Sequence, residues 1–200
     1  HLVFVSSDFV FDPSRRTFPQ REDNTGFLSD DSYGAKKRRC EEVLLNSGPR
    51  AIPWTILRPC HIYGPGSQLG CLPCHGRDPD LVARMQRGEA LRLVGGGHFL
   101  QQPILAADLA DIALACPGNP RACSRILHTA GPDLVESRMY YHMIAAAVGC
   151  ECRIEELSVQ DYLAEHPEHR SFMCHRVYSL QALAEAGIPL PPTPLAVGLR

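Results

Sequence analysis

A helix between two short apolar runs constrains the fold of this chain most strongly. Residues 2–5 (LVFV) and 54–57 (WTIL) are almost entirely apolar, and such runs are typical of strands buried on both faces of a sheet. Segment 33–44 between them has the spacing of an amphipathic helix, and Gly48-Pro49 is expected to end it. The order strand, helix, strand predicts an α/β fold with a parallel sheet.

Tyr33 and Lys37 share one face of this helix, because four residues are about one turn. They lie on a stripe that continues through Cys40 and Leu44, which predicts that the pair packs inward. An ammonium group beside a phenol favours the phenolate, so Lys37 is expected to lower the pKa of Tyr33. Such a phenol can exchange a proton with a substrate hydroxyl at neutral pH. Glu41 follows Lys37 by four residues, which predicts a surface ion pair.

The rest of the chain continues the alternation of helices and strands. Capping and turn residues predict helices over 78–88, 106–116 and 137–148, and strands over 91–94, 125–129 and 152–157. No internal repeat or low-complexity segment interrupts this pattern.

Charge and composition argue against two classes of partner. The net charge of −2 gives no electrostatic case for binding nucleic acid. No apolar run approaches the length that spans a membrane, and no signal peptide is visible. The nine cysteines are therefore expected to be mostly reduced thiols in a cytoplasmic protein.

Four motifs follow one another along the chain. They are 6–11 (SSDFVF), 33–37 (Y-x-x-x-K), 58–66 (RPCHIYGPG) and 103–110 (PILAADLA). Each is weak alone, but the ordered set resembles the extended short-chain dehydrogenase/reductase family, the group of NAD-dependent epimerases and dehydratases. The resemblance covers nearly the whole chain. The first motif looks most like sugar-nucleotide reductases and the third more like epimerases, so the subfamily stays open.

The resemblance implies three catalytic residues, Ser7, Tyr33 and Lys37. Ser7 would hold a substrate oxygen by a hydrogen bond, and Tyr33 would move the proton. Lys37 would lower the pKa of Tyr33 and, together with it, contact the cofactor at the nicotinamide ribose. Pro59 and Cys60 would line the nicotinamide side of the site. The cofactor, NAD or NADP, would carry the hydride.

Three further positions are implied as substrate contacts, and each departs from the family pattern. Asp8 is present, but Phe9 stands where dehydratases of the group carry Glu, which argues against dehydration. Gln101 stands seven residues before Asp108, where epimerases often carry an arginine for the diphosphate. A neutral amide cannot make that charge-assisted contact. His61 replaces a frequent Asn and can still donate or accept a hydrogen bond.

The family's nucleotide fingerprint, G-x-x-G-x-x-G, is absent. Gly95-Gly96-Gly97 is no substitute, because it does not open a helix. We therefore expect a piece of a longer protein that binds NAD weakly alone. The implied fold is α/β, the C-terminal half of a Rossmann-type parallel sheet plus a small α/β substrate domain. Residues 1–66 are assigned to the sheet domain, with elements of about 101–130 returning to it, and 67–200 mainly to the substrate domain.

The function that the resemblance implies is NAD(P)-dependent epimerisation or reduction of a sugar or sugar nucleotide. A homodimer through helices of the sheet domain is also implied. Two alternatives stay open: a non-catalytic relative that binds RNA or a partner protein, and a remnant without independent activity. The intact set of Ser7, Tyr33 and Lys37 argues against the first, and the missing glycine loop supports the second for this chain.

Residues 71–75 (CLPCH) match the attachment signature of c-type haem. Their two thiols and imidazole could also join Cys60 or His61 in a zinc site. Haem attachment requires export to an oxidising compartment, for which no signal is visible. In a chain with nine cysteines the pattern arises easily by chance, so coincidence is the favoured interpretation and no metal site is expected.

Overall fold

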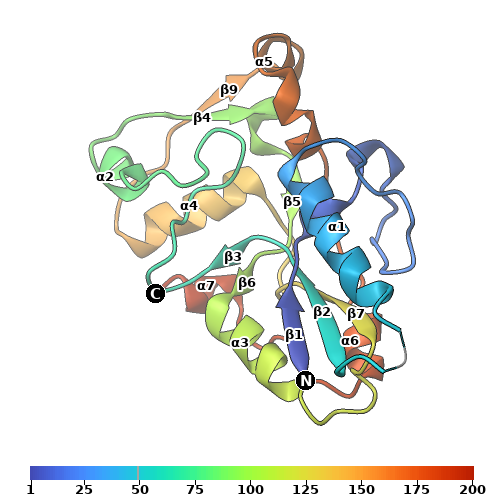
Figure 1. The fold of residues 1–200 in the computed structure, drawn as a ribbon. Helices are drawn as coiled ribbons and strands as arrows, with labels where there is room; N and C mark the ends of the chain where they lie inside the picture. Colours follow the sequence, from blue (N-terminus) through green and yellow to red (C-terminus); the bar gives the residue numbers. More distant parts are fainter. Residues whose placement is uncertain (49) are drawn as a thin grey trace.

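A parallel three-stranded sheet organises the structure (Figure 1). The computed structural model describes residues 1–48 and 50–200. The strand order is β1-β2-β7, and the strands are β1 (Leu2–Val5), β2 (Trp54–Pro59) and β7 (Arg125–Thr129). Both pairings are parallel. All six residues of the central strand β2 are buried, as its apolar run predicts. The α/β fold class is thereby confirmed.

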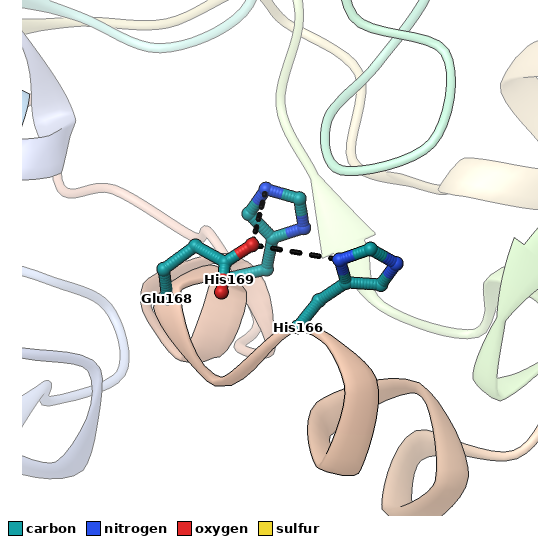
Figure 2. A group of neighbouring side chains, drawn as sticks. All are labelled: His166, Glu168 and His169. Atoms are coloured by element: carbon teal, nitrogen blue, oxygen red, sulfur yellow. Dashed lines mark ion pairs between the residues drawn. The ribbon is translucent and has the colours of Figure 1, made fainter.

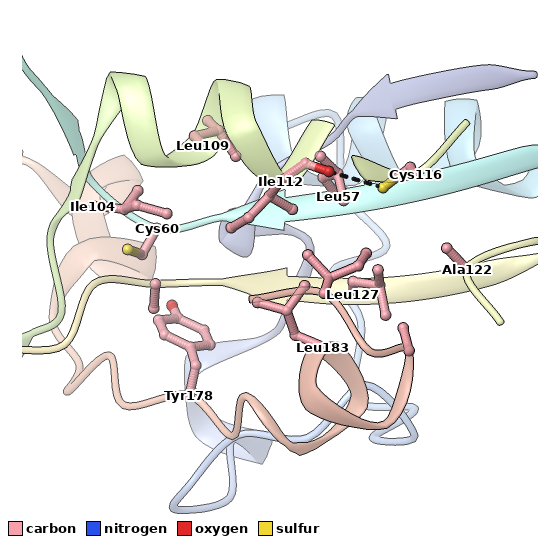
Figure 3. Packing of buried hydrophobic residues seen from close by; sticks show 13 residues of the cluster. Leu57, Cys60, Ile104, Leu109, Ile112, Cys116, Ala122, Leu127, Tyr178 and Leu183 are labelled. Atoms are coloured by element: carbon pink, nitrogen blue, oxygen red, sulfur yellow. Dashed lines mark hydrogen bonds between the residues drawn. The ribbon is translucent and has the colours of Figure 1, made fainter. Parts of the chain in front are cut away.

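Helices and a hydrophobic cluster hold this sheet. The helices are α1 (Tyr33–Leu45), α3 (Ala106–Ala115) and α6 (Gln181–Glu185). Leu57 and Leu127 from neighbouring strands pack with Ile112 of α3 and Leu183 of α6 (Figure 3). Burying one such side chain completely stabilises the fold by roughly 1.5–3 kcal/mol. The predicted helix over 106–116 thus belongs to the layer that covers the sheet.

A second set of elements packs around its own apolar cluster, with α2, β4 and β9 in the upper part of Figure 1. Its strands form three pairs: β4 (Leu91–Val94) with β9 (Ile154–Leu157), β5 (Leu100–Gln101) with β8 (Val135–Glu136), and β3 (Ile62–Tyr63) with β6 (Ile104–Leu105). Its helices include α2 (Leu81–Gln86) and the longer α4 (Ser137–Ala147). Tyr140, Tyr141 and Ile144 of α4 pack with Leu91 of β4 in this cluster.

Short helical segments complete the fold. They are η1 (Asp8–Val10), η2 (Pro13–Arg15), η3 (Gly95–Gly97), α5 (Val159–Glu165), η4 (Pro167–Phe172) and α7 (Leu195–Gly198). None of the helices among the described residues is long and apolar enough to cross a bilayer.

Two burial predictions for the N-terminal region are wrong. Strand β1 is not buried on both faces, because Leu2 is 39% and Val5 42% exposed. Within residues 1–48 and 50–200, β1 pairs with β2 alone and so lies at the sheet edge. The Tyr33/Lys37 stripe does not pack inward either: Tyr33 is 58% exposed, and the buried side of α1 carries Gly34, Ala35 and Glu41. The helix stop at Gly48-Pro49 lies partly outside the described residues.

Candidate active site

The chain turns sharply at the carboxyl end of β1, and this turn positions Ser7. The Oγ atom of Ser7 accepts a hydrogen bond from the N–H of Phe9 at 3.2 Å, which caps η1. The Ser7 side chain is buried beside this turn. The ring of Phe9 then meets the ring of Tyr33 edge-on, with centroids 6.5 Å apart. The structure therefore brings the segment that carries Ser7 against the start of α1.

Tyr33 and Lys37 lie side by side on the open face of α1. Ser32 caps the helix by accepting a hydrogen bond from the N–H of Ala35 at 3.3 Å. The Nζ atom of Lys37 lies 5.9 Å from the Tyr33 ring centroid and donates to the backbone oxygen of Val5 at 3.0 Å. Lys37 thereby ties α1 to the carboxyl end of β1, the edge at which open α/β sheets bind their ligands.

The pKa of Tyr33 is raised, not lowered as its spacing from Lys37 predicts. Partial burial is the main cause, and the Asp8 carboxylate adds to it, while Arg77 acts in the opposite direction. The ammonium group of Lys37 is directed at the Val5 carbonyl instead of the phenol oxygen. In this structure burial therefore outweighs any effect of Lys37 on the pKa of Tyr33, and the activating role of Lys37 stays a prediction.

Gly34 allows the close approach of α1 to η1. A Cβ atom at this position would lie 1.8 Å from the backbone oxygen of Phe9 and 2.6 Å from its carbonyl carbon. Both atoms belong to the backbone, so a neighbouring side chain cannot relieve the clash by turning away. Sequence patterns gave no sign of this requirement.

Replacing Gly34 with Ala is expected to lower the free energy of unfolding by roughly 1–3 kcal/mol, since the added methyl group pushes α1 away from η1. Urea unfolding followed by circular dichroism measures the change. Lys36→Ala, on the exposed side of the same helix, is the control and should leave stability nearly unchanged. Equal stability of the Gly34→Ala variant and the parent would show that the close approach is not required.

Glu41 anchors a buried ion-pair network and does not form the predicted surface pair with Lys37. Its carboxylate accepts hydrogen bonds from Arg58 at 2.9 and 2.7 Å, from Ser6 at 2.6 Å and from Arg38 at 3.0 Å. Glu41 and Arg58 are both fully buried. Burial opposes ionisation of Glu41, but the hydrogen bonds and charge of Arg58 prevail and hold its pKa below the ordinary value. The network fixes α1, β2 and the end of β1 relative to one another.

Asp8 is implied as a substrate contact by the family resemblance. In the structure it lies in a second buried cluster, where its carboxylate is bound by other side chains. Tyr178 donates to its carboxylate at 2.5 Å. Arg176 and Arg16 lie 3.4 and 3.8 Å from the same oxygen. The Asp8 side chain is almost fully enclosed, so its role in this structure is to hold η1 against the C-terminal segment. Two guanidinium groups against one carboxylate leave the cluster with a net positive charge.

His61 and Gln101, two predicted substrate contacts, meet around Cys71. The Cys71 thiol donates to Oε1 of Gln101 at 3.3 Å, and the Nε2 atom of His61 lies 3.1 Å from the Tyr140 hydroxyl. Burial opposes charge on both His61 and Cys71. Their mutual attraction nevertheless raises the pKa of His61 and lowers that of Cys71. The structure thus brings His61 and Gln101 together around Cys71, and their contact with a substrate stays a prediction.

A small cavity adjoins this group. Its volume is about 30 Å³, and its lining includes Cys71, Gln101, Tyr141, Phe172 and Arg176. The Nε2 atom of Gln101 is buried and has no hydrogen-bond partner among the described residues. A cavity of this size holds little more than one water molecule.

Arg176 is the residue that sequence reasoning missed. It is 9% exposed, and its guanidinium carbon lies 4.5 Å from the ring centroid of Phe9. Within residues 1–48 and 50–200, its Nε and Nη2 atoms have no hydrogen-bond partner. The cavity therefore has a cationic wall, although Gln101 itself is neutral. No local pattern marks Arg176, because its partner Asp8 lies near the other end of the chain.

Pro59 and Cys60, the other predicted cofactor contacts, are buried. The Cys60 thiol donates to the backbone oxygen of Gln102, and its side chain packs with Leu57 and Ile104 in the core under the sheet (Figure 3). Burial strongly raises the pKa of this thiol. The structure therefore does not present the Cys60 side chain to a cofactor.

The residues of the haem-like run 71–75 are directed to different partners. His75 is buried and its Nε2 atom lies 3.1 Å from the backbone oxygen of Arg92, whereas Cys71 faces Gln101. In the part of the chain that the structure describes, Cys71, Cys74 and His75 do not gather into a three-donor group. All nine cysteines are free thiols.

The family of this chain is shown by its match to a family model, and the parallel α/β sheet agrees with it. The model of the NAD dependent epimerase/dehydratase family matches residues 1–127, so the chain belongs to this family. A search of curated protein sequences gave no match.

Solved structures show the same fold. The UDP-N-acetylglucosamine 4-epimerase of Methanobrevibacter ruminantium, in complex with UDP-N-acetylmuramic acid, has a TM-score of 0.77 at 16% identity and covers 99% of this chain. The UDP-glucose 4-epimerase of Thermus thermophilus, in complex with NAD, has a TM-score of 0.69 at 18% identity and covers 100%. This chain spans only 60% and 61% of those two proteins, respectively.

Proposed function

We propose that the chain forms the catalytic and substrate-binding part of an NAD-dependent enzyme that epimerises or reduces a sugar nucleotide. The observation that carries this proposal is the arrangement at the carboxyl end of β1. Ser7 lies in the turn after the strand, and Lys37 is fastened to Val5 with Tyr33 exposed beside it. The solved relatives with UDP-sugars or NAD support the same class of substrate and cofactor.

The residues at this edge fit one end of the cofactor. Tyr33 and Lys37 offer a hydroxyl and an ammonium group on an open face, which suits the ribose next to the nicotinamide. NAD, when bound, would accept and return a hydride. NADP remains the alternative. Because the chain holds no G-x-x-G-x-x-G loop, we propose that it binds NAD weakly by itself, and a measured micromolar affinity would overturn this.

Proton transfer falls to Tyr33 in this proposal. Its phenolate would take the proton from the substrate hydroxyl and become the phenol, and Ser7 would hold the same substrate oxygen. Ser7 now accepts a hydrogen bond from Phe9, and its own hydroxyl hydrogen remains able to donate. The raised pKa of Tyr33 means that a positive charge must approach before the phenolate is populated at neutral pH.

The substrate diphosphate would lie near Arg176. Its guanidinium group supplies the positive charge that Gln101 lacks, and the amide of Gln101 and the ring of His61 lie in the same group. The present cavity is far smaller than the roughly 300–1,000 Å³ of small-molecule sites. Segments 71–74 and 172–176, which line it, would therefore move apart on binding.

Two further assignments belong to this proposal. Residues 1–66 with the returning strand β7 would form the sheet domain, and most of 67–200 the substrate domain. The apolar side chains Val43 and Leu45 on α1 are 70% and 40% exposed, which supports a homodimer through this helix.

The direct test is to supply a panel of UDP- and dTDP-sugars with NAD or NADP to the protein encoded by its complete reading frame. NMR should detect an epimerised or reduced sugar, and the product decides between the two reactions. Absence of turnover with every sugar, despite measured cofactor binding, would favour a non-catalytic binding protein and refute the enzyme assignment.

A further inference from the structure

Two histidines and a glutamate gather where α5 passes into η4. His166 is the residue between these helices, and Glu168 and His169 lie within η4 (Figure 2). The carboxylate of Glu168 lies between the two imidazole rings (Figure 2). The three side chains are 44%, 63% and 29% exposed, respectively, so ions in solution have access to them.

The donor atoms have the separations that a metal ion requires. Oε1 of Glu168 lies 3.5 Å from Nδ1 of His166 and 3.7 Å from Nε2 of His169. All three atoms lie within 4.8 Å of one another. Two ligands bound about 2.0–2.1 Å from a tetrahedral zinc ion lie roughly 3.3–3.4 Å apart. Small side-chain rotations would therefore bring the three atoms onto one ion.

Aromatic contacts hold both imidazoles in place before any ion arrives. The rings of His166 and His169 are stacked with centroids 5.3 Å apart, and Tyr162 of α5 packs against both. The Tyr162 hydroxyl lies 2.8 Å from Nδ1 of His169. With the proton on Nδ1 and directed at Tyr162, the Nε2 lone pair of His169 is free for a metal, which is the usual support for a ligating histidine.

We propose that His166, Glu168 and His169 form a zinc site with Tyr162 as its positioning residue. Two imidazole nitrogens and one carboxylate are a ligand set that suits Zn²⁺, and water would complete the tetrahedron. The site is separate from residues 71–75, which contribute no donor to it.

Zinc would also stiffen the approach to the candidate active site. Phe172 at the end of η4 packs on the ring of His169, with centroids 5.4 Å apart, and on the ring of Phe9 at 5.3 Å. Phe9 in turn contacts Tyr33. An ion bound by His166 and His169 would therefore restrict the motion of η4. Through Phe172 it would also hold the segment that carries Ser7 and Phe9.

Cobalt titration of the purified protein, carrying no polyhistidine tag, tests the site. Co²⁺ substitutes for Zn²⁺ and is visible: nitrogen and oxygen ligands give weak visible bands, whereas thiolates add an intense near-ultraviolet band. One equivalent of Co²⁺ should bind without producing the thiolate band, and added Zn²⁺ should displace the bound Co²⁺. His166→Ala, His169→Ala and Glu168→Gln should each weaken binding by roughly tenfold or more.

Two further variants sharpen the test. Tyr162→Phe should weaken binding by roughly tenfold and shift the visible bands while leaving the circular dichroism spectrum unchanged. His98→Ala is the matched control, because His98 also pairs with a glutamate, Glu136 at 3.1 Å, but has no second histidine on that carboxylate. It should bind like the parent. The zinc site would be refuted if the parent bound no Co²⁺ or showed a thiolate band. It would also be refuted if the His166 and His169 variants bound Co²⁺ as tightly as the parent.

Discussion

Replacing Glu41 with Ala is expected to lower the free energy of unfolding by about 3–5 kcal/mol, the usual cost of removing one partner from a buried ion pair. Arg58 would remain fully buried with its charge uncompensated, and Ser6 would lose its acceptor. Urea unfolding gives the value. Glu42→Ala is the matched control, because Glu42 also pairs with Arg38 but is 48% exposed, and its loss should cost no more than about 1 kcal/mol.

Acid unfolding provides an independent check on the same residue. The pKa of Glu41 is lower in the folded protein than its ordinary value of 4.5. The stability that it contributes is therefore present above about pH 4.5 and is lost as the pH falls through the folded pKa. Glu41→Gln should remove this part of the acid dependence. An unchanged acid profile in that variant, or equal costs for the Glu41 and Glu42 substitutions, would contradict a dominant role for the Glu41–Arg58 pair.

Replacing Tyr33 with Phe is expected to reduce kcat by roughly 10²–10⁴-fold, the range for loss of a general acid–base. The substitution removes one hydroxyl from an exposed side chain, so stability should hardly change. Steady-state kinetics of the cofactor-loaded enzyme measures the effect. The rate of the parent should rise with pH as Tyr33 ionises, and this rise should be absent from the variant.

Neighbouring lysines on α1 provide the control for that prediction. Lys37→Met should lower kcat and weaken cofactor binding, because Lys37 lies against Tyr33 and the end of β1. Lys36→Met changes the net charge equally, but Lys36 is exposed and, among the described residues, makes neither the hydrogen bond to Val5 nor the contact with the Tyr33 ring that Lys37 makes. It should retain the parent's kinetics. Similar losses in both lysine variants, or a Tyr33→Phe enzyme with full activity, would exclude the proposed proton transfer.

The sequence predicts those features that depend on local patterns. The apolar runs place strands β1 and β2, and the four-residue spacing places Tyr33 and Lys37 on one helical face, as found. Local patterns do not reveal which face is covered, because that depends on neighbouring elements. The stripe that begins at Tyr33 therefore lies outward and not inward.

Pairings between distant residues explain the other differences. Lys37 lies one helical turn from Glu41, yet Glu41 pairs with Arg58. Arg58 belongs to β2, which packs beneath the helix. Asp8 contacts Tyr178 across 170 positions of sequence, and the same fold brings Arg176 to the cavity. Such contacts depend on the tertiary arrangement of strands and loops. The spacing of residues along the chain does not reveal that arrangement.

The open edge of β1 also has a consequence for assembly. A strand with one paired neighbour carries a row of backbone N–H and C=O groups that can pair with another strand. A parallel strand added there would cover Leu2 and Val5, which are now exposed, and would extend the sheet by one position. Its carboxyl end would then lie next to Lys37, so the residues that follow it would form a further wall beside Tyr33.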